Sequence, residues 1–166
     1  MDTSWRDLFE IGSFVVTIVG LPFAIGVFLW EQRRERENEE EEAYQLLNDA
    51  YNDFLKVVLA NADLQLRTKE ALPNPTGEQR ERMLVIFDML VGLFERAYLV
   101  AWKEHMTETE ARRWNSWDDV MREWCRREDF VNAMPGLLSG EDAGFAEYIQ
   151  RVAAEETQGG EQRPAR

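Results

Sequence analysis

One uninterrupted run of uncharged residues, from position 11 to position 30, constrains this chain most. The run is IGSFVVTIVGLPFAIGVFLW, and the 32 acidic and 19 basic residues all lie outside it. Twenty residues rising about 1.5 Å each give a helix of about 30 Å, which matches the hydrocarbon thickness of a bilayer. A cleaved signal peptide fits poorly, because Asp2, Asp7 and Glu10 precede the run and it exceeds the usual apolar length of about 7 to 15 residues. The run therefore predicts a retained single transmembrane helix.

The charges that flank the run predict its orientation. Arg33, Arg34 and Arg36 follow it, whereas Arg6 alone precedes it. Arg and Lys near a span favour the cytoplasmic side, and acidic residues contribute little to this rule. We therefore expect residues 1–10 to form a short stub outside the inner (plasma) membrane, with the rest of the chain in the cytoplasm.

Two tryptophans mark the ends of the predicted span. Indole rings favour the headgroup region of a bilayer, where one side of the ring is apolar and the N–H is hydrated. With the arginines they form the predicted membrane interface, which contacts the lipid bilayer as a partner: Trp5, Trp30, Arg33, Arg34 and Arg36.

Small residues inside the span suggest association between copies of the chain. Gly20 and Ala24 are four residues apart, so they lie on one face, where small side chains let membrane helices approach closely. The alternative is that such residues are simply common in membrane helices. We take Gly20 and Ala24 as the candidate helix-association residues and expect a homo-oligomer.

The remainder of the chain predicts helices and no sheet. Residues 31–42, EQRRERENEEEE, are polar helix formers that continue the span as a charged stalk. Residues 43–156 carry helical periodicity with no alternating apolar run, and residues 157–166 are typical of a disordered tail. The predicted fold is all-α: a single N-terminal transmembrane helix that continues into a stalk, then a small cytoplasmic bundle of four or five helices.

Local patterns divide the predicted bundle. Capping boxes at Thr76 with Gln79 and at Thr107 with Glu110 predict two helix starts, and the run 83–102, apolar on most faces, predicts the most buried helix. Pro135 and Gly136 predict a break. Helical spacing predicts two apolar stripes: a heptad-like seam of Tyr44, Leu47, Tyr51, Phe54 and Val58, and a core stripe of Trp114, Trp117, Met121 and Trp124, aided by Trp102.

The Trp-rich segment carries a resemblance. Its sequence is WNSWDDVMREWCRREDFVNAMPGLLSGEDAGFAEYIQ, and it follows MLVIFDMLVGLFERAYLVAW. These stretches resemble the C-terminal part of uncharacterised bacterial proteins with one N-terminal transmembrane helix and a small Trp-rich helical cytoplasmic domain. The resemblance covers about half of the chain, in the spacing of its aromatic residues, and it implies a topology and a fold but no activity.

The residue inventory excludes several function classes. A net charge of −13 opposes binding to nucleic acid, which needs a basic track. One cysteine, Cys125, and one histidine, His105, exclude an intramolecular disulfide and a zinc site built from several such ligands. The arginines of the Trp-rich helix are expected to pair with neighbouring acids. We therefore predict no catalytic, cofactor-binding or metal-binding residues, no cofactor and no enzyme activity.

Two classes of function remain from the sequence. The first is a membrane-anchored cytoplasmic interaction or scaffolding module, self-associating and bound to a protein partner of unknown identity. The alternative is an oligomeric membrane-perturbing or pore-forming effector of a bacterial defence or toxin system, although Ser13 and Thr17 are the only polar side chains offered to line a pore. An enzyme with a site between the helices is a third reading that no residue pattern supports.

Overall fold

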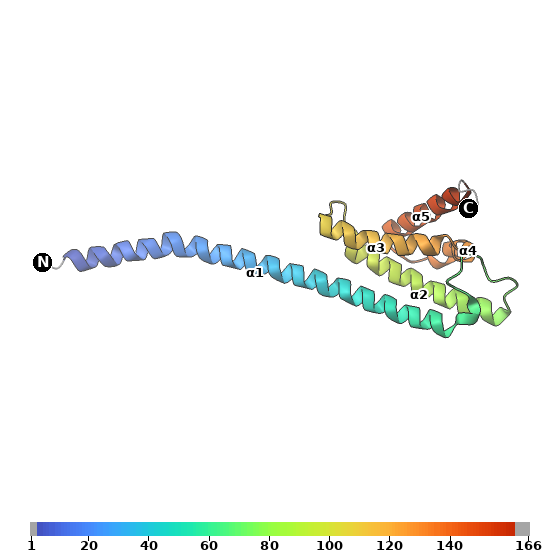
Figure 1. Ribbon diagram of the computed structural model, residues 1–166. Coiled ribbons are helices and arrows are strands. Elements are labelled where there is room, and N and C mark those ends of the chain that lie inside the picture. Colours follow the sequence, from blue (N-terminus) through green and yellow to red (C-terminus); the bar gives the residue numbers. More distant parts are fainter. Residues whose placement is uncertain (1–2, 162–166) are drawn as a thin grey trace. The chain divides into compact units, whose positions relative to one another are not determined.

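The computed structural model describes the backbone of residues 3–161 and the side chains of residues 25–35 and 38–158. Over this range the secondary structure is helical and contains no strand (Figure 1). The helices are α1 (Thr3–Ala60), α2 (Gly77–Ala101), α3 (Glu108–Cys125), α4 (Glu128–Leu137) and α5 (Ala143–Glu161), with a 3-10 turn, η1 (Ala62–Leu64), after α1. The prediction of an all-α helical fold is confirmed.

The chain divides into two compact units, Met1–Ala43 and Tyr44–Arg166. In the first unit, residues 31–42 belong to α1 and are helical, as expected of the stalk. No helix in the described part of the chain is long and apolar enough to cross a membrane. The predicted span, residues 11–30, lies for the most part outside the residues whose side chains are described, so it stays a prediction.

The two predicted capping boxes are confirmed. Thr76 Oγ1 accepts a hydrogen bond from the backbone N–H of Gln79, whose side chain accepts one from the N–H of Thr76 at 3.0 Å. The same reciprocal pair joins Thr107 and Glu110, at 3.4 and 2.7 Å. These bonds satisfy N–H groups that the first turn of a helix leaves without partners, and they fix where α2 and α3 begin.

Aromatic side chains form the core of the second unit. Trp114, Trp117 and Trp124 are 7%, 3% and 2% exposed, which confirms the predicted stripe. Phe87 of α2 lies edge-on to Trp124 and to Phe130 of α4, with ring centroids 6.5 and 5.3 Å apart. Such rings combine a large buried area with favourable edge-to-face geometry. The core therefore joins α2, α3 and α4 through one aromatic cluster.

Trp102 is a correction to that expectation. We expected it to add to the core, but it lies one residue beyond α2 and is 39% exposed, with its ring stacked on Tyr98 at 5.2 Å. The backbone turns extended at this position, with φ −80° and ψ 133°. Because Trp102 no longer has helical backbone angles, its side chain does not point toward the core as a further helical residue would.

The heptad-like seam of α1 packs within the bundle, as its width suggested. Leu47, Phe54 and Val58 are buried. Tyr51 contacts Trp117 and Phe54 contacts Trp124, both edge-on at 5.7 Å. The seam is thus occupied by α3 and is no open surface for a second copy.

The expected break occurs just after Pro135 and Gly136, because α4 ends at Leu137, whereas the expected end of the last helix is wrong. Pro135 lies inside α4, in its last turn, where a missing N–H costs a single helical hydrogen bond. Helix α5 continues to Glu161, so the first five residues of the predicted tail are helical, and residues 162–166 lie outside the described residues. Arg122 of α3 and Arg126, its C-cap, form ion pairs with Glu155 and Glu156, just before these five residues.

Replacing a core tryptophan should destabilise the bundle strongly. We expect Trp117→Ala to lower the free energy of unfolding by about 3 to 5 kcal/mol, because it removes a buried ring and leaves a cavity. The measurement is denaturant unfolding of the full chain in detergent, followed by helical circular dichroism. Trp102→Ala is the control and should cost about 1 kcal/mol or less, as expected of an exposed ring. Equal losses in the two variants would contradict the core described above.

The cap of α3 should make stability depend on pH. The hydrogen bond from Lys103, at 2.6 Å, and that from the N–H of Thr107 lower the pKa of Glu110 from 4.5 to about 2. A carboxyl with a lowered folded-state pKa stabilises the fold above its unfolded pKa, and the contribution is lost as the pH falls through the folded one. Glu110→Gln keeps the capping bond without the charge. We expect its stability deficit against the wild type to be full near pH 7 and to shrink between about pH 4.5 and pH 2; a deficit independent of pH would refute this.

Candidate functional site

A buried arginine holds the loop between η1 and α2 against the start of α4. Arg127 is 2% exposed, and its Nη1 donates to the backbone oxygens of Gln65 and Thr68, both at 2.8 Å. Its Nε lies 2.7 Å from Asp129 Oδ1. A buried charge is tolerated when it is paired and hydrogen-bonded. Asp129 therefore neutralises the charge of Arg127, and the hydrogen bonds that Arg127 donates fix an irregular segment of the chain.

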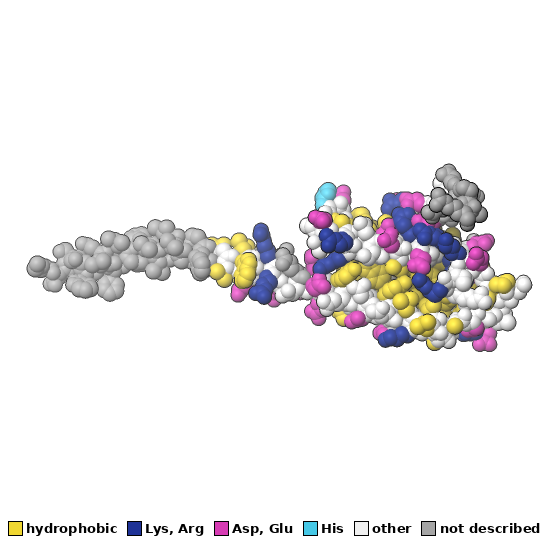
Figure 2. All heavy atoms as spheres, in the orientation of Figure 1, with side chains coloured by type: hydrophobic (Ala, Val, Ile, Leu, Met, Phe, Trp, Pro, Cys, Tyr) yellow, Lys and Arg dark blue, Asp and Glu magenta, His cyan; other side chains and the backbone are white. Residues whose placement is uncertain are grey.

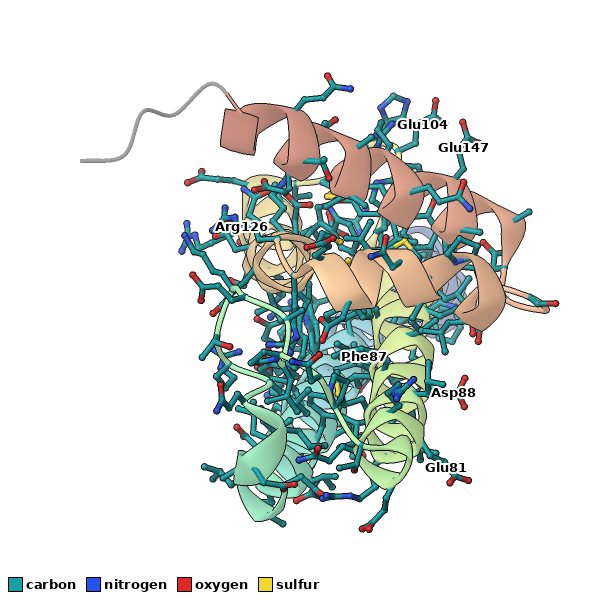
Figure 3. The ribbon with its side chains drawn as sticks, turned by 90° about the vertical axis from the view of Figure 1, so that its right-hand side faces the viewer. Glu81, Phe87, Asp88, Glu104, Arg126 and Glu147 are labelled. Carbon is teal, nitrogen blue, oxygen red and sulfur yellow. The ribbon has the colours of Figure 1, made fainter. Side chains whose placement is uncertain are left out.

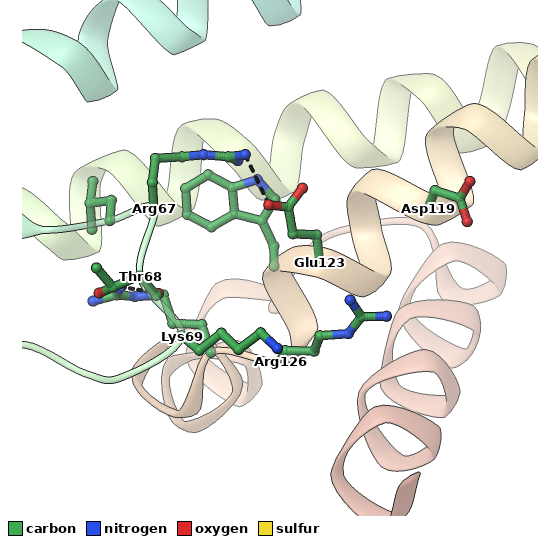
Figure 4. A pocket seen from close by; sticks show the side chains of 9 residues that line it. Arg67, Thr68, Lys69, Asp119, Glu123 and Arg126 are labelled. Atoms are coloured by element: carbon green, nitrogen blue, oxygen red, sulfur yellow. Dashed lines mark hydrogen bonds and ion pairs between the residues drawn. The ribbon is translucent and has the colours of Figure 1, made fainter. Parts of the chain in front are cut away.

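That loop and α3 enclose a cleft of about 340 Å³. Figure 4 shows Arg67 over the ring of Trp124, 5.9 Å from its centroid, with a hydrogen bond of 2.9 Å to Glu123. The lining contains four cations and two carboxylates, so the cleft is locally basic in an acidic chain. The lining residues are Leu66, Arg67, Thr68, Lys69, Asp119, Glu123, Trp124, Arg126 and Arg127.

The chemistry open to this cleft is limited. Its arginines already have acidic partners, since Arg67 bonds to Glu123 and Arg126 Nε lies 2.6 Å from Glu156. Within the described part of the chain, Lys69 is the lining cation that forms no ion pair. The adjacent thiol, Cys125, is 1% exposed, and burial raises its pKa to about 12, which keeps it protonated. The cleft offers one cation to an anion and no activated nucleophile.

Polar contacts between α3 and α5 serve the fold. Tyr148 donates to Asp118, and Arg122 bridges Asp118 and Glu155 at 2.8 Å each. Burial and the bond to Asp118 raise the pKa of Tyr148. All four groups are occupied by one another, so this cluster joins two helices and leaves no group free for a ligand.

The arginines of α3 and its C-terminal end follow the expected pairing. Four ion pairs to acidic residues are seen among them, and Arg113 lies over the ring of Tyr44 at 5.3 Å. The pairs are Arg112 with Glu108, Arg122 with Asp118, Arg126 with Glu156 and Arg127 with Asp129. They form no basic track for a nucleic acid or a lipid surface.

Helix α2 has a second apolar face that nothing in the bundle covers. Figure 3 shows Phe87 directed into the bundle, with Glu81 and Asp88 directed away from it. On the outward side a large apolar surface remains open, and monomeric soluble domains seldom expose such contiguous patches. We call these residues the outer face of α2: Leu84, Val85, Met89, Leu99 and Val100, which are 50%, 57%, 45%, 58% and 46% exposed.

Gly92 lies at the centre of the outer face. A Cβ atom built on it meets no heavy atom within 4 Å, so no neighbouring element approaches the helix there. Val85, Gly92 and Leu99 follow one another at intervals of seven residues, which places them nearly on one line along the helix. The surface of the outer face is therefore shallowest at Gly92, which has no side chain, and it is apolar on both sides of that residue.

Two exposed charged residues, Asp88 and Arg96, lie beside the outer face of α2. In the described part of the chain neither Asp88 nor Arg96 forms an ion pair, and Arg96 Nε donates to the backbone oxygen of Gly92 at 3.1 Å. Beside Asp88, the hydrogen bond to Glu95, burial and the charges of Glu95 and Asp88 raise the pKa of Glu141. The outer face thus has an acidic edge, which Asp88, Glu95 and Glu141 form.

A second hollow, of about 440 Å³, lies between α4 and α5. It contains no charged residue and little polar surface, so it offers no group that selects a ligand by charge. Its lining residues are Val131, Met134, Pro135, Gln150, Ala153, Ala154, Thr157 and Gln158.

The predicted membrane-interface residues are described only in part. Trp30 is 61% exposed, Arg34 lies over its ring at 5.6 Å, and Arg33 is exposed. Figure 2 shows an apolar band in the N-terminal part of the described side chains, followed by basic side chains. The side chains of Trp5, Arg36, Gly20 and Ala24 lie outside the described residues. These assignments stay predictions.

Ligands for a metal do not gather in the part of the chain that the structure describes. No group of three or more His, Cys, Asp or Glu side chains there is arranged to hold an ion. His105, the only histidine, is exposed in the turn between α2 and α3.

Sequence reasoning missed the outer face of α2. The run 83–102 was expected to be the most buried helix because apolar residues occupy most of its circumference. Its inner half is buried, but its outer half is open. Asp88, Gly92 and Arg96, spaced by four residues, mark that open half, and this spacing was the available signal.

Comparisons with known protein families, with curated proteins and with solved structures found no match to this chain. Evidence for a function therefore comes from the residues and their geometry.

Removing the buried cation should destabilise the loop beside the cleft. We expect Arg127→Met to lower the free energy of unfolding by about 3 kcal/mol or more, because it leaves Asp129 and two loop oxygens without their donor. The neighbouring Arg126→Met is the matched control and should cost about 1 kcal/mol or less, since that ion pair is half exposed. Denaturant unfolding of both variants measures the difference, and a loss in Arg127→Met no larger than in the control would contradict the role assigned to Arg127.

Proposed function

We propose that this chain is a membrane-anchored helical interaction module that self-associates and holds its helical unit on the cytoplasmic side. The proposal for the anchor rests on the uncharged run 11–30 and on the arginines that follow it. The interface residues would be Trp5, Trp30, Arg33, Arg34 and Arg36. Gly20 and Ala24 would add contacts between spans.

The outer face of α2 is the observation that carries the interaction part of the proposal. Five large apolar side chains are about half exposed along one helix, around a glycine with open space in front of it. Exposed contiguous apolar surface is typical of an interface that is covered in the working assembly. A protein surface that matches an apolar helix face is the partner best suited to it.

Among the described residues, the polar side chains of the cleft form no catalytic arrangement, which supports a binding role over an enzyme. The cleft beside Trp124 has paired arginines and a buried, protonated thiol. Its volume is small, and its one unpaired cation, Lys69, is solvent-exposed. These features suit a structural indentation more than a reaction site.

One set of strains tests both the membrane anchor and the side of the membrane on which the helical unit lies. A reporter that is active only in the cytoplasm, fused after Arg166, should work, and the full chain should fractionate with membranes. The control lacks residues 1–30 and should be found in the soluble fraction. Changing Arg33, Arg34 and Arg36 together to Glu should reduce the cytoplasmic signal several-fold, because the charge bias that sets the orientation is removed.

Two results would overturn this proposal. A C-terminal reporter active outside the cytoplasm would reverse the orientation, and a full chain recovered in the soluble fraction would remove the anchor. The same strains separate the module from a pore. A module leaves membrane conductance unchanged on overexpression, whereas leakage that disappears in a Gly20→Leu and Ala24→Leu double variant would establish the pore-forming effector instead.

A further inference from the structure

We propose that the outer face of α2 binds a basic amphipathic helix of another protein. This inference rests on the proposed interaction role and names the chemistry of the partner. The apolar side chains of the outer face supply the contact area, and the acidic edge beside them selects the charge. A helix whose apolar side is flanked by Lys or Arg satisfies both requirements.

The apolar part of this surface follows one line along α2. Val85 and Leu99 are 57% and 58% exposed, and Gly92 lies between them at the same spacing of seven residues. Met89, which is 45% exposed, lies beside this line. A Cβ atom built on Gly92 meets no heavy atom within 4 Å, so a second helix can approach the backbone of α2 closely there. A helix that is apolar along one side therefore fits this line.

Acidic side chains follow the apolar line on one flank. Glu81 extends the acidic edge, because Glu81, Asp88 and Glu95 are also spaced by seven residues. Each of them precedes a member of the apolar line by four residues, which makes the two neighbours on the helix surface. Figure 3 shows Glu81 and Asp88 on the same side of α2, directed away from the bundle. Charges in this position beside an apolar line determine which helix pairs with which in a coiled coil.

The bundle does not neutralise these carboxylates. In the described part of the chain, none of Glu81, Asp88 and Glu95 forms an ion pair, and Glu95 accepts its hydrogen bonds from Glu141 and from the backbone N–H of Asp142. The carboxylates between α3 and α5 are instead bound to arginines of the same chain. A partner with Lys or Arg along one side would supply the opposite charge that the edge lacks.

Other occupants match this surface less well. In a two-fold pair of α2 helices each flank meets the same flank of the second copy, so Asp88 would meet the like-charged Glu95. The same carboxylates would repel an anionic lipid surface or a nucleic acid. Arg96 lies on the other side of the apolar line and donates to the backbone oxygen of Gly92. The partner should therefore carry its basic residues on one flank only.

Two synthetic helices test the charge of the partner. Both are helix-forming peptides of about 21 residues with Leu along one side, and they carry either Lys or Glu at the same positions along one flank of the Leu residues. The full chain is placed in nanodiscs of phosphatidylcholine, which has no net charge and does not attract the Lys peptide. Fluorescence anisotropy of the labelled peptides should show that the Lys peptide binds about tenfold more tightly or better than the Glu peptide. Equal binding of the two peptides would overturn the proposal.

Charge reversal on α2 locates the binding site. Glu81→Lys with Asp88→Lys should weaken the Lys peptide about tenfold and strengthen the Glu peptide by a similar factor, because the contacts change sign. The matched control is Glu104→Lys with Glu147→Lys, which changes the net charge equally at exposed positions that Figure 3 shows apart from Glu81 and Asp88. The control should change either affinity by about twofold or less, since distant exposed charges are screened. Equal effects in the two variants would show attraction to the whole acidic chain and would overturn the outer face as the site.

A polar substitution tests the apolar contact. Val85→Ser with Leu99→Ser should weaken the Lys peptide about tenfold, because less apolar surface is buried on binding. Leu46→Ser with Leu59→Ser is the control on α1, where these side chains are 62% and 76% exposed, and it should leave the affinity unchanged. All four positions are more than half exposed, so both variants should keep the helical circular dichroism of the wild type. Unchanged affinity in the first variant would also overturn the proposal.

The outcomes separate this inference from the proposed function. An anchored chain that binds the two peptides equally would refute the basic partner and leave an anchored module with a partner of other chemistry. A full chain recovered in the soluble fraction would remove the anchor, and the same titrations on the soluble chain would still decide the charge of the partner. A chain that binds neither peptide, and whose oligomer dissociates in the Val85→Ser and Leu99→Ser variant, would assign the outer face to a second copy and overturn the proposal.

Discussion

Helix α2 is apolar around most of its circumference, and a small bundle can cover only one side of a helix. Its inner side receives the aromatic cluster of Phe87, Trp124 and Phe130, which joins three helices through edge-on ring contacts. Because the neighbouring helices pack on the inner side only, the outer side stays exposed. The other interactions of the unit, from the capping boxes to the ion pairs of α3, fix the elements that surround the inner side and leave the outer side open.

The polar contacts of the bundle join its helices and loops to one another near the surface. Arg127 fixes the loop after η1, Arg122 and Arg126 form ion pairs with α5, and Arg82 lies 2.7 Å from Asp63 of η1. Each cation has an acidic or backbone partner, so these residues are occupied by the fold. This occupation explains why a chain rich in charge presents so little chemistry to a ligand.

The sequence predicts elements well where a local interaction decides the outcome. The side chains of Thr76 and Thr107 bond to N–H groups three residues away, so their capping boxes are visible in the sequence, and the 3 and 4 spacing of Trp114, Trp117 and Trp124 selects one helical face. Prediction from the sequence failed where contacts with residues distant in the sequence decide the structure. Helix α5 outlasts its apolar stripe, and its Glu156 forms an ion pair with Arg126, the C-cap of α3. The outer face of α2 has no partner within the chain, and apolarity alone does not distinguish a buried side from an open one.

The shared hydrogen bond between Glu141 and Glu95 has a consequence for binding equilibria. Repulsion at this edge raises the pKa of Glu141, so the edge retains a proton more readily than an isolated carboxyl would. A cation that binds at this edge would lower that pKa and release the proton to solvent. Binding of a cationic group at this edge would then be linked to proton release, and by mass action such a group would bind more tightly as the pH rises through the raised pKa.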